Sequence, residues 1–260
     1  MSVIRTDRWL LESYDSPTQL CKKLTSYFNE GTDLEIHQHL TSHGMYRRPF
    51  QNGEKAVNDL KGSWDIVRKE EKLLKKEWDG PNIPIFIFPA DNSNQKLKRD
   101  FNGKSGLAFK DKLFLFISES NAEKEIKALF THEYNHVCRL SKFDKNEEDY
   151  VLLDTIILEG LAENAVREFV GEDFLANWTT YYSVKELNKL WNNLVLPNKE
   201  TLNFERAHQD ILYGLRFAPK MAGYCAGYYI VKKYMEANDL TSKDLLNKDS
   251  RIIAQIKKFN

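Results

Sequence analysis

The most informative part of the sequence is Leu129-Phe-Thr-His132-Glu133-Tyr-Asn-His136-Val-Cys-Arg-Leu140. His132 and His136 are four residues apart, so on a helix both imidazoles project from one face and can reach a single metal ion. Glu133 lies one step round the helix, where its carboxylate can reach a water bound to that ion without being a ligand itself. Asn121 offers an N-cap with Glu123 in the first turn, so we expect a helix over residues 122–140 with a metal site on one face.

The pattern His-Glu-x-x-His is typical of zinc hydrolases. Zn²⁺ in such enzymes takes three protein ligands and keeps a fourth position open. We expect Glu159 to be the third ligand, because it follows His136 by 23 residues, enough for a second helix to return antiparallel to the first. Glu163 lies one helical turn further on and can accept the second N–H of a ligand histidine, which orients the imidazole. A salt-bridged helix surface is the alternative interpretation of Glu163.

Two other groups could imitate metal ligands. Cys138 is two residues from His136, a helical rotation of about 200°, so we expect it to point away from the ion and into the core. His39 and His43 also have the four-residue spacing, with His37 nearby, but no acid follows His39. We interpret these three histidines as a solvated or structural group.

Composition indicates a globular chain with a sizeable core. Its 260 residues are 42% hydrophobic and 12% aromatic with a formal net charge of zero, which excludes global disorder and gives no electrostatic argument for nucleic-acid binding. No apolar stretch reaches the roughly 18 residues of a membrane span, and the start, with an early Asp7, lacks a signal-peptide pattern. The three cysteines are widely spaced and predict buried reduced thiols rather than a disulfide framework. We therefore expect a cytoplasmic protein.

The order of predicted elements indicates a helix-rich α+β fold. The chain has only 12 Gly and 7 Pro, and apolar positions at helical spacing predict one helix over residues 56–78. A β-rich run at 83–88 and a hairpin formed by 106–109 and 112–117 predict a small sheet. The helices expected after the metal-site helix cover residues 150–170, 184–195 and 224–235.

The same motifs carry a resemblance. His132-Glu-x-x-His136 followed by Glu159-x-x-x-Glu163 resembles the gluzincin metalloproteases, in which a Glu is the third zinc ligand and an acid four residues later supports the first His. The words His132-Glu-Tyr-Asn-His136-Val, Glu159-Gly-Leu-Ala-Glu163 and Gly223-Tyr-Cys-Ala-Gly227-Tyr are similar to the YjaZ-type family of bacterial predicted Zn-dependent proteases, over roughly residues 80–235. The resemblance implies a zincin-like fold, with a small sheet before the active-site helix and a helical C-terminal lobe. We expect a helical N-terminal segment, residues 1–80, packed on a catalytic domain, residues 81–260.

Peptidases of this architecture commonly hold the substrate as an extra β-strand. The strand of Gly106, Leu107, Ala108 and Phe109 is the candidate edge for such pairing. In gluzincin aminopeptidases the matching region resembles Gly-x-Met-Glu-Asn, whose Glu binds the free amine of the substrate. No acid occupies that place here, which favours an endopeptidase.

A hydrolase also needs a donor for the developing oxyanion besides zinc, which gluzincins usually supply as His or Tyr from the C-terminal half. We favour Tyr224, because the adjacent Gly223 would let backbone and ring approach a cleft. Tyr228, Tyr213 and His208 are the other candidates. Aromatic core packing is the alternative interpretation of Tyr224.

Together the residues and the resemblance predict a zinc-dependent metallopeptidase of gluzincin type, acting on a peptide or protein substrate. Zn²⁺ would be held by His132, His136 and Glu159, and would lower the pKa of its water towards about 7. Glu133 would take the proton from that water and pass it to the leaving amine. The alternative is a zinc-stabilised binding or regulatory protein with a vestigial protease site, and the intact Glu133 argues against it. No feature of the sequence indicates an oligomeric state.

Overall fold

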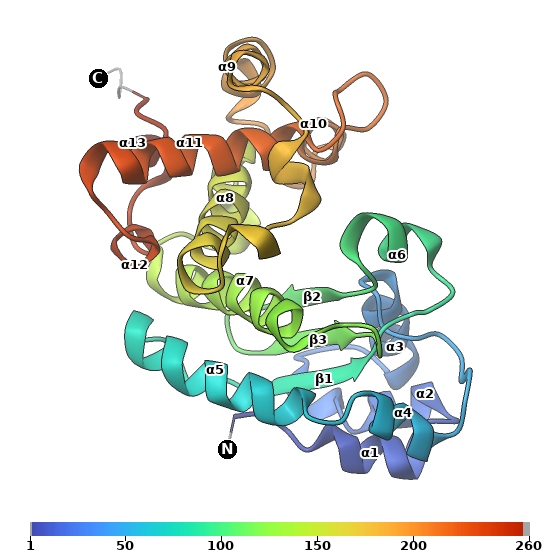
Figure 1. The fold of residues 1–260 in the computed structure, drawn as a ribbon. Coiled ribbons are helices and arrows are strands. Elements are labelled where there is room, and N and C mark those ends of the chain that lie inside the picture. The colour runs from blue at the N-terminus through green and yellow to red at the C-terminus, as the bar shows by residue number, and fades with distance from the viewer. Residues whose placement is uncertain (1, 257–260) are drawn as a thin grey trace. The chain divides into compact units, whose positions relative to one another are not determined.

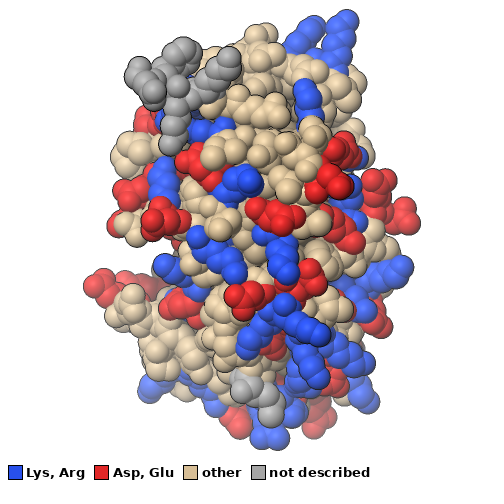
Figure 2. Space-filling model, turned by 90° about the vertical axis from the view of Figure 1, so that its left-hand side faces the viewer, with Lys and Arg blue, Asp and Glu red and all other residues tan. Residues whose placement is uncertain are grey.

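Residues 2–256 are described in the computed structural model, which shows the expected α+β fold (Figure 1). Within α7 (Glu123–Lys142), between Val137 and Cys138, the chain divides into two compact units. The domain boundary expected near residue 80 stays a prediction. None of the helices in the described range is long and apolar enough to cross a lipid bilayer. On the face shown in Figure 2, basic and acidic side chains are interspersed.

The first unit begins with helices and ends with a small sheet and most of α7. Its elements before α7 are α1 (Thr6–Ser13), α2 (Pro17–Lys22), η1 (Thr25–Tyr27), α3 (Asp33–Ser42), α4 (Gly53–Asp59), α5 (Ser63–Trp78), β1 (Ile85–Pro89), α6 (Gln95–Phe101), β2 (Ser105–Ala108) and β3 (Leu113–Ile117). The label η marks short 3₁₀ turns, apart from the π-helical η5.

The second unit contains the end of α7 and a series of further helices. These are η2 (Glu147–Asp149), α8 (Leu152–Phe169), η3 (Glu172–Phe174), η4 (Asn177–Thr180), α9 (Val184–Leu190), η5 (Trp191–Val195), η6 (Leu196–Asn198), α10 (Arg206–Tyr213), α11 (Ala222–Asn238), α12 (Ser242–Leu245) and α13 (Ser250–Ile253). The helices predicted over 150–170, 184–195 and 224–235 correspond to α8, to α9 with η5, and to α11.

The prediction of a single helix over residues 56–78 is wrong, because the structure has two helices there. α4 ends at Asp59 and α5 begins at Ser63. Gly62 between them has a left-handed backbone with φ of 95°, a conformation that glycine adopts readily and that cannot continue an α-helix. α5 then ends at Trp78, as expected.

The predicted sheet is present, with the strand order β1–β3–β2 in the described residues. β1 and β3 run parallel, and β2 and β3 form the predicted antiparallel hairpin. The segment from Ser2 to Ile4 pairs with the outer edge of β1. Ile4 N–H donates to Ile85 O and Ile85 N–H donates to Ser2 O, both at 2.9 Å. β2 forms the opposite edge of the sheet, which confirms the expected edge position.

Alternation along the strands divides the sheet into two faces. One face carries Phe86 and Phe114, whose rings stack 4.9 Å apart. Aromatic rings from the N-terminal segment cover this face, namely Trp9, Tyr27 and Phe28. The other face lies toward α7, which crosses the sheet on the side away from α1 (Figure 1). Tyr134 of α7 fixes the helix to this unit, since its O–H donates to Pro81 O at 2.9 Å and its ring stacks on Trp78.

In the second unit, α8 and α11 pack with almost no space between their backbones. A Cβ on Gly160 would lie 2.8 Å from Tyr228 N, and a Cβ on Gly227 would overlap the carbonyl oxygen of Ile156. Asn164 of α8 spans the same contact, because its Nδ2 donates to Tyr228 O at 3.1 Å. The glycines in the two sequence words Glu159-Gly-Leu-Ala-Glu163 and Gly223-Tyr-Cys-Ala-Gly227 therefore let these two helices touch.

Replacing Gly227 by Ala should lower the free energy of unfolding by about 1–3 kcal/mol, the usual cost of overpacking, because the added methyl group meets the Ile156 carbonyl. In a helix without such a contact, the same change raises the free energy of unfolding by about 0.5–1 kcal/mol. A loss of stability would therefore indicate the close contact. Urea denaturation measures it. Lys233→Ala, exposed on α11, is the control and should change the value by less than about 0.5 kcal/mol. A stabilising Gly227→Ala would contradict the close contact.

Candidate metal centre and active site

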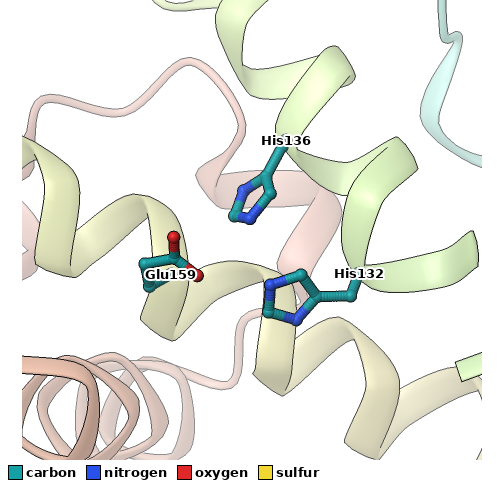
Figure 3. A group of neighbouring side chains, drawn as sticks. All are labelled: His132, His136 and Glu159. Atoms are coloured by element: carbon teal, nitrogen blue, oxygen red, sulfur yellow. The ribbon is translucent and has the colours of Figure 1, made fainter. Parts of the chain in front are cut away.

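Two helices contribute the predicted metal ligands. His132 and His136 lie on α7 and Glu159 lies on α8, and Figure 3 shows their side chains directed toward one another. One ligand atom from each residue lies within 4.8 Å of the others. The imidazole centroids of the two histidines are 4.6 Å apart, with the rings nearly perpendicular at 89°. The structure thus brings together the three residues that the spacing singled out.

This donor set fits zinc. Two imidazoles and one carboxylate are the ligands of a recurrent type of catalytic zinc site, which leaves a coordination position open. Two atoms that each bind zinc at about 2.1 Å are at most about 4.2 Å apart, so small side-chain rotations bring ligand atoms that lie within 4.8 Å to one ion. Across residues 2–256, no second group of three His, Cys, Asp or Glu side chains is arranged to hold an ion.

Glu133 lies on α7 against the backbone of β2. Its side chain is buried, with 8% of its surface exposed. Gly106 pairs with Leu115 in the sheet, and a Cβ on Gly106 would overlap Cγ and Cδ of Glu133 and lie 2.5 Å from its Oε1. The carboxylate therefore occupies space that is open only because residue 106 has no side chain.

The outer edge of β2 presents backbone groups at alternate residues. Phe109 N–H donates to Lys112 O at 2.9 Å, which makes these two residues a hydrogen-bonded pair. Because such pairs alternate along an antiparallel ladder, Leu107 also bonds to β3, whereas the N–H and C=O groups of Gly106 and Ala108 point away from β3. Two of the four residues predicted to bind substrate thus direct their backbone polar groups outward, and one is the glycine beside the Glu133 carboxylate.

The expected supporting carboxylate, Glu163, is buried one turn after Glu159 on α8. Only 3% of its surface is exposed, and its Oε1 accepts the backbone N–H of Ala176 at 2.5 Å. This bond uses one carboxylate oxygen. Support of a ligand histidine by the other oxygen stays a prediction.

Tyr224, the favoured oxyanion donor, lies at the third ligand. Its O–H donates to Glu159 Oε1 at 3.2 Å. The ring of Tyr213 packs against that of Tyr224, with centroids 5.5 Å apart. Burial, followed by the negative charge of Glu159, raises the pKa of both phenols above the usual range, so both keep their protons at neutral pH. An oxyanion role would require Tyr224 to turn away from Glu159.

The other two candidate donors have partners of their own. His208 is buried, and its Nε2 lies 3.0 Å from the hydroxyl of Thr155. Burial lowers the pKa of His208 and favours the neutral imidazole. The ring of Tyr228 packs edge-on against Trp178, with centroids 6.3 Å apart.

The groups that could imitate ligands show ordinary environments. Cys138 is fully buried, as expected. Cys21 and Cys225 are buried as well, and burial raises the pKa of each thiol to about 12, as in unreactive core cysteines. His39 and His43 are exposed at the end of α3, where His43 Nδ1 lies 2.8 Å from the His39 carbonyl oxygen. These contacts agree with a solvated group.

Sequence reasoning missed two contacts of the site. The first is the space that Gly106 leaves for Glu133, although a glycine inside a predicted strand is a known signal of close approach. The second is the bond from Ala176 to Glu163, for which a backbone N–H leaves no signal in the sequence. The ring contact between Tyr213 and Tyr224 depends on how α10 meets α11.

Comparisons with known proteins identify the family of the chain. The chain matches the family model described as "Predicted Zn-dependent protease (DUF2268)" over residues 63–255. It is 40% identical to the uncharacterized protein YjaZ of Bacillus subtilis, over 95% of this chain and 96% of that protein. It is 25% identical to the uncharacterized protein YjfC of the same organism, over 79% of this chain and 74% of that protein. No solved structure matches the chain significantly. The family match includes the three candidate ligands and Glu133, and the chain belongs to this family of predicted Zn-dependent proteases.

Proposed function

We propose that this protein is a zinc-dependent metallopeptidase of gluzincin type that cleaves internal peptide bonds. The observation that carries the proposal is the convergence of His132, His136 and Glu159, whose ligand atoms lie within 4.8 Å of one another. Membership of a family of predicted Zn-dependent proteases supports the metal and the class of reaction.

The catalytic roles divide among side chains of α7 and α8. Zn²⁺, when bound by the two histidines and Glu159, supplies a Lewis acid and lowers the pKa of its water. Glu133 is turned about 100° from His132 on the helix, so its carboxylate lies beside the ligands rather than among them. It accepts a proton from the attacking water and delivers that proton to the leaving amine. The burial of Glu133 limits exchange of the proton with bulk water.

Glu163 supports the ligand set from α8. A carboxylate that accepts the second N–H of a ligand histidine fixes its tautomer and raises its basicity. Such a role needs a carboxylate held in one orientation. The bond from Ala176 N–H and the 3% exposure of Glu163 supply that restraint.

A peptide substrate pairs with the outer edge of β2. When it lies antiparallel to this strand, its backbone can bond to the outward N–H and C=O groups of Gly106 and Ala108. Pairing at Gly106 brings the peptide backbone close to Glu133, since Gly106 contacts that side chain. The segment from Gly106 to Phe109 contains no acid to bind a free amine, which supports cleavage within a chain rather than at its N-terminus.

Glu133→Gln should keep the fold and the zinc content while hydrolysis falls by at least about 10²-fold. The amide retains the size of the carboxylate but cannot accept the proton. The measurement compares zinc content, melting temperature and cleavage of a mixed peptide library, with fragments identified by mass spectrometry. Glu123→Gln, exposed in the first turn of the same helix, is the matched control and should cleave like the wild type.

Two outcomes would contradict this account. Equal cleavage by wild type and Glu133→Gln would remove the catalytic role assigned to Glu133. A zinc-loaded wild type that cleaves no peptide in the library would contradict the peptidase proposal and favour a zinc-stabilised binding protein.

Gly106→Ala should lower turnover by on the order of 10²-fold, the effect of misplacing a catalytic group by about 1 Å, while zinc content stays at the wild-type level. The added methyl group overlaps the Glu133 carboxylate, and that carboxylate must move because the strand backbone cannot. Steady-state kinetics on a peptide from the library, together with metal analysis, measures both quantities.

Gly53→Ala provides the control for this variant. Its Cβ would lie 2.7 Å from Leu10 O, in the contact between α1 and α4, so it should lower the melting temperature without lowering turnover per folded molecule. Full turnover by Gly106→Ala would show that the Glu133 carboxylate does not need the space at residue 106.

A further inference from the structure

The third ligand depends on outside support more than the two histidines do. His132 and His136 share one helix face, and their relative placement follows from the helical repeat. Glu159 comes from another helix and has a flexible side chain with several rotatable bonds. Ligating carboxylates are generally hydrogen-bonded by neighbouring groups that fix their orientation, and loss of such a group typically weakens metal affinity.

One tyrosine of the second unit donates a hydrogen bond to Glu159. The O–H of Tyr224 donates to Glu159 Oε1 at 3.2 Å. A phenol has one proton to donate, so this bond uses the donor capacity of Tyr224.

Packing holds the Tyr224 ring in this arrangement. The ring contacts Trp178 edge-on, with centroids 5.2 Å apart, and Tyr213, with centroids 5.5 Å apart. Tyr213 is the last residue of α10, and its carbonyl oxygen accepts the N–H of Met221, which immediately precedes α11, at 2.9 Å. This hydrogen bond closes the loop between α10 and α11 at Tyr213.

Glycines bring the tyrosine-bearing helix close to its neighbours. A Cβ on Gly223, which directly precedes Tyr224, would lie 2.8 Å from Leu212 Cα of α10. Four residues later, Gly227 brings α11 onto α8, the helix that carries Glu159. These two close helix contacts place the Tyr224 hydroxyl where it can reach the ligand carboxylate.

We infer that Tyr224 is a positioning residue that holds Glu159 in its ligand orientation. The inference rests on the proposed function in one respect, since it treats Glu159 as a zinc ligand. It gives Tyr224 a different role from the oxyanion donor expected from the sequence. The two roles differ in what they affect: a positioning residue changes zinc affinity, whereas an oxyanion donor changes kcat at full zinc occupancy.

The test is the zinc dissociation constant of the full-length protein, measured by competition with a chromophoric chelator. Tyr224→Phe should raise the Kd for zinc by about 10- to 100-fold. In a Glu159→Ala background, Tyr224→Phe should have no further effect, because the acceptor of the Tyr224 hydroxyl is gone. Tyr229→Phe is the matched control on the same helix, since the Tyr229 hydroxyl bonds to Asn188 instead, and its Kd should equal that of the wild type.

The outcomes separate this inference from the proposed function. A Tyr224→Phe protein with unchanged zinc Kd and a lowered kcat would overturn the positioning role and restore the oxyanion role. An unchanged Kd and an unchanged kcat in Tyr224→Phe, with an unchanged melting temperature, would overturn the positioning role while leaving the zinc site intact. A wild type that does not bind one zinc ion per chain would overturn the zinc site itself.

Discussion

The helical repeat of α7 is the constraint on which the candidate active site depends. One helix must present two imidazoles to an ion and, a little more than a quarter turn away, a carboxylate to the water that the reaction consumes. Both tasks fail if the helix rotates. Tyr134 resists rotation in the first unit, because its hydroxyl bonds to Pro81 O and its ring stacks between Trp78 and Phe130. The aromatic residue inside the His132-Glu-Tyr-Asn-His136 word thus anchors the polar residues around it.

Glycine recurs wherever the site needs an approach closer than a side chain allows. Gly106 leaves room for the Glu133 carboxylate, and Gly160 and Gly227 let α8 and α11 touch. The same approach carries Tyr224 to Glu159. These glycines lie in a strand and in helices, where glycine usually weakens local structure by about 0.5–1 kcal/mol. Their positions indicate that contact geometry at the site outweighs that local loss.

Periodicity explains which parts of this architecture could be predicted from the sequence. The four-residue spacing of His132 and His136 requires only a helix, and Glu159 requires only a second helix at a suitable chain separation. The hairpin edge followed from two short β-rich runs with a turn between them. The break at Gly62 was missed because the apolar stripe continues across it, although the glycine itself marks the place. The bonds that complete the site, from Ala176 to Glu163 and from Tyr224 to Glu159, depend on tertiary packing that no local pattern encodes.

The central claim is that His132, His136 and Glu159 form the metal centre. X-ray absorption at the zinc edge of the zinc-loaded protein tests it most directly, because Zn–S bonds near 2.3 Å are readily separated from Zn–N and Zn–O bonds of about 2.0–2.1 Å. We expect a shell of nitrogen and oxygen only, with scattering from two imidazoles. The chain has three cysteines and six histidines, so other shells are chemically available. A sulfur contribution, or scattering from three or more imidazoles, would contradict the proposed ligand set.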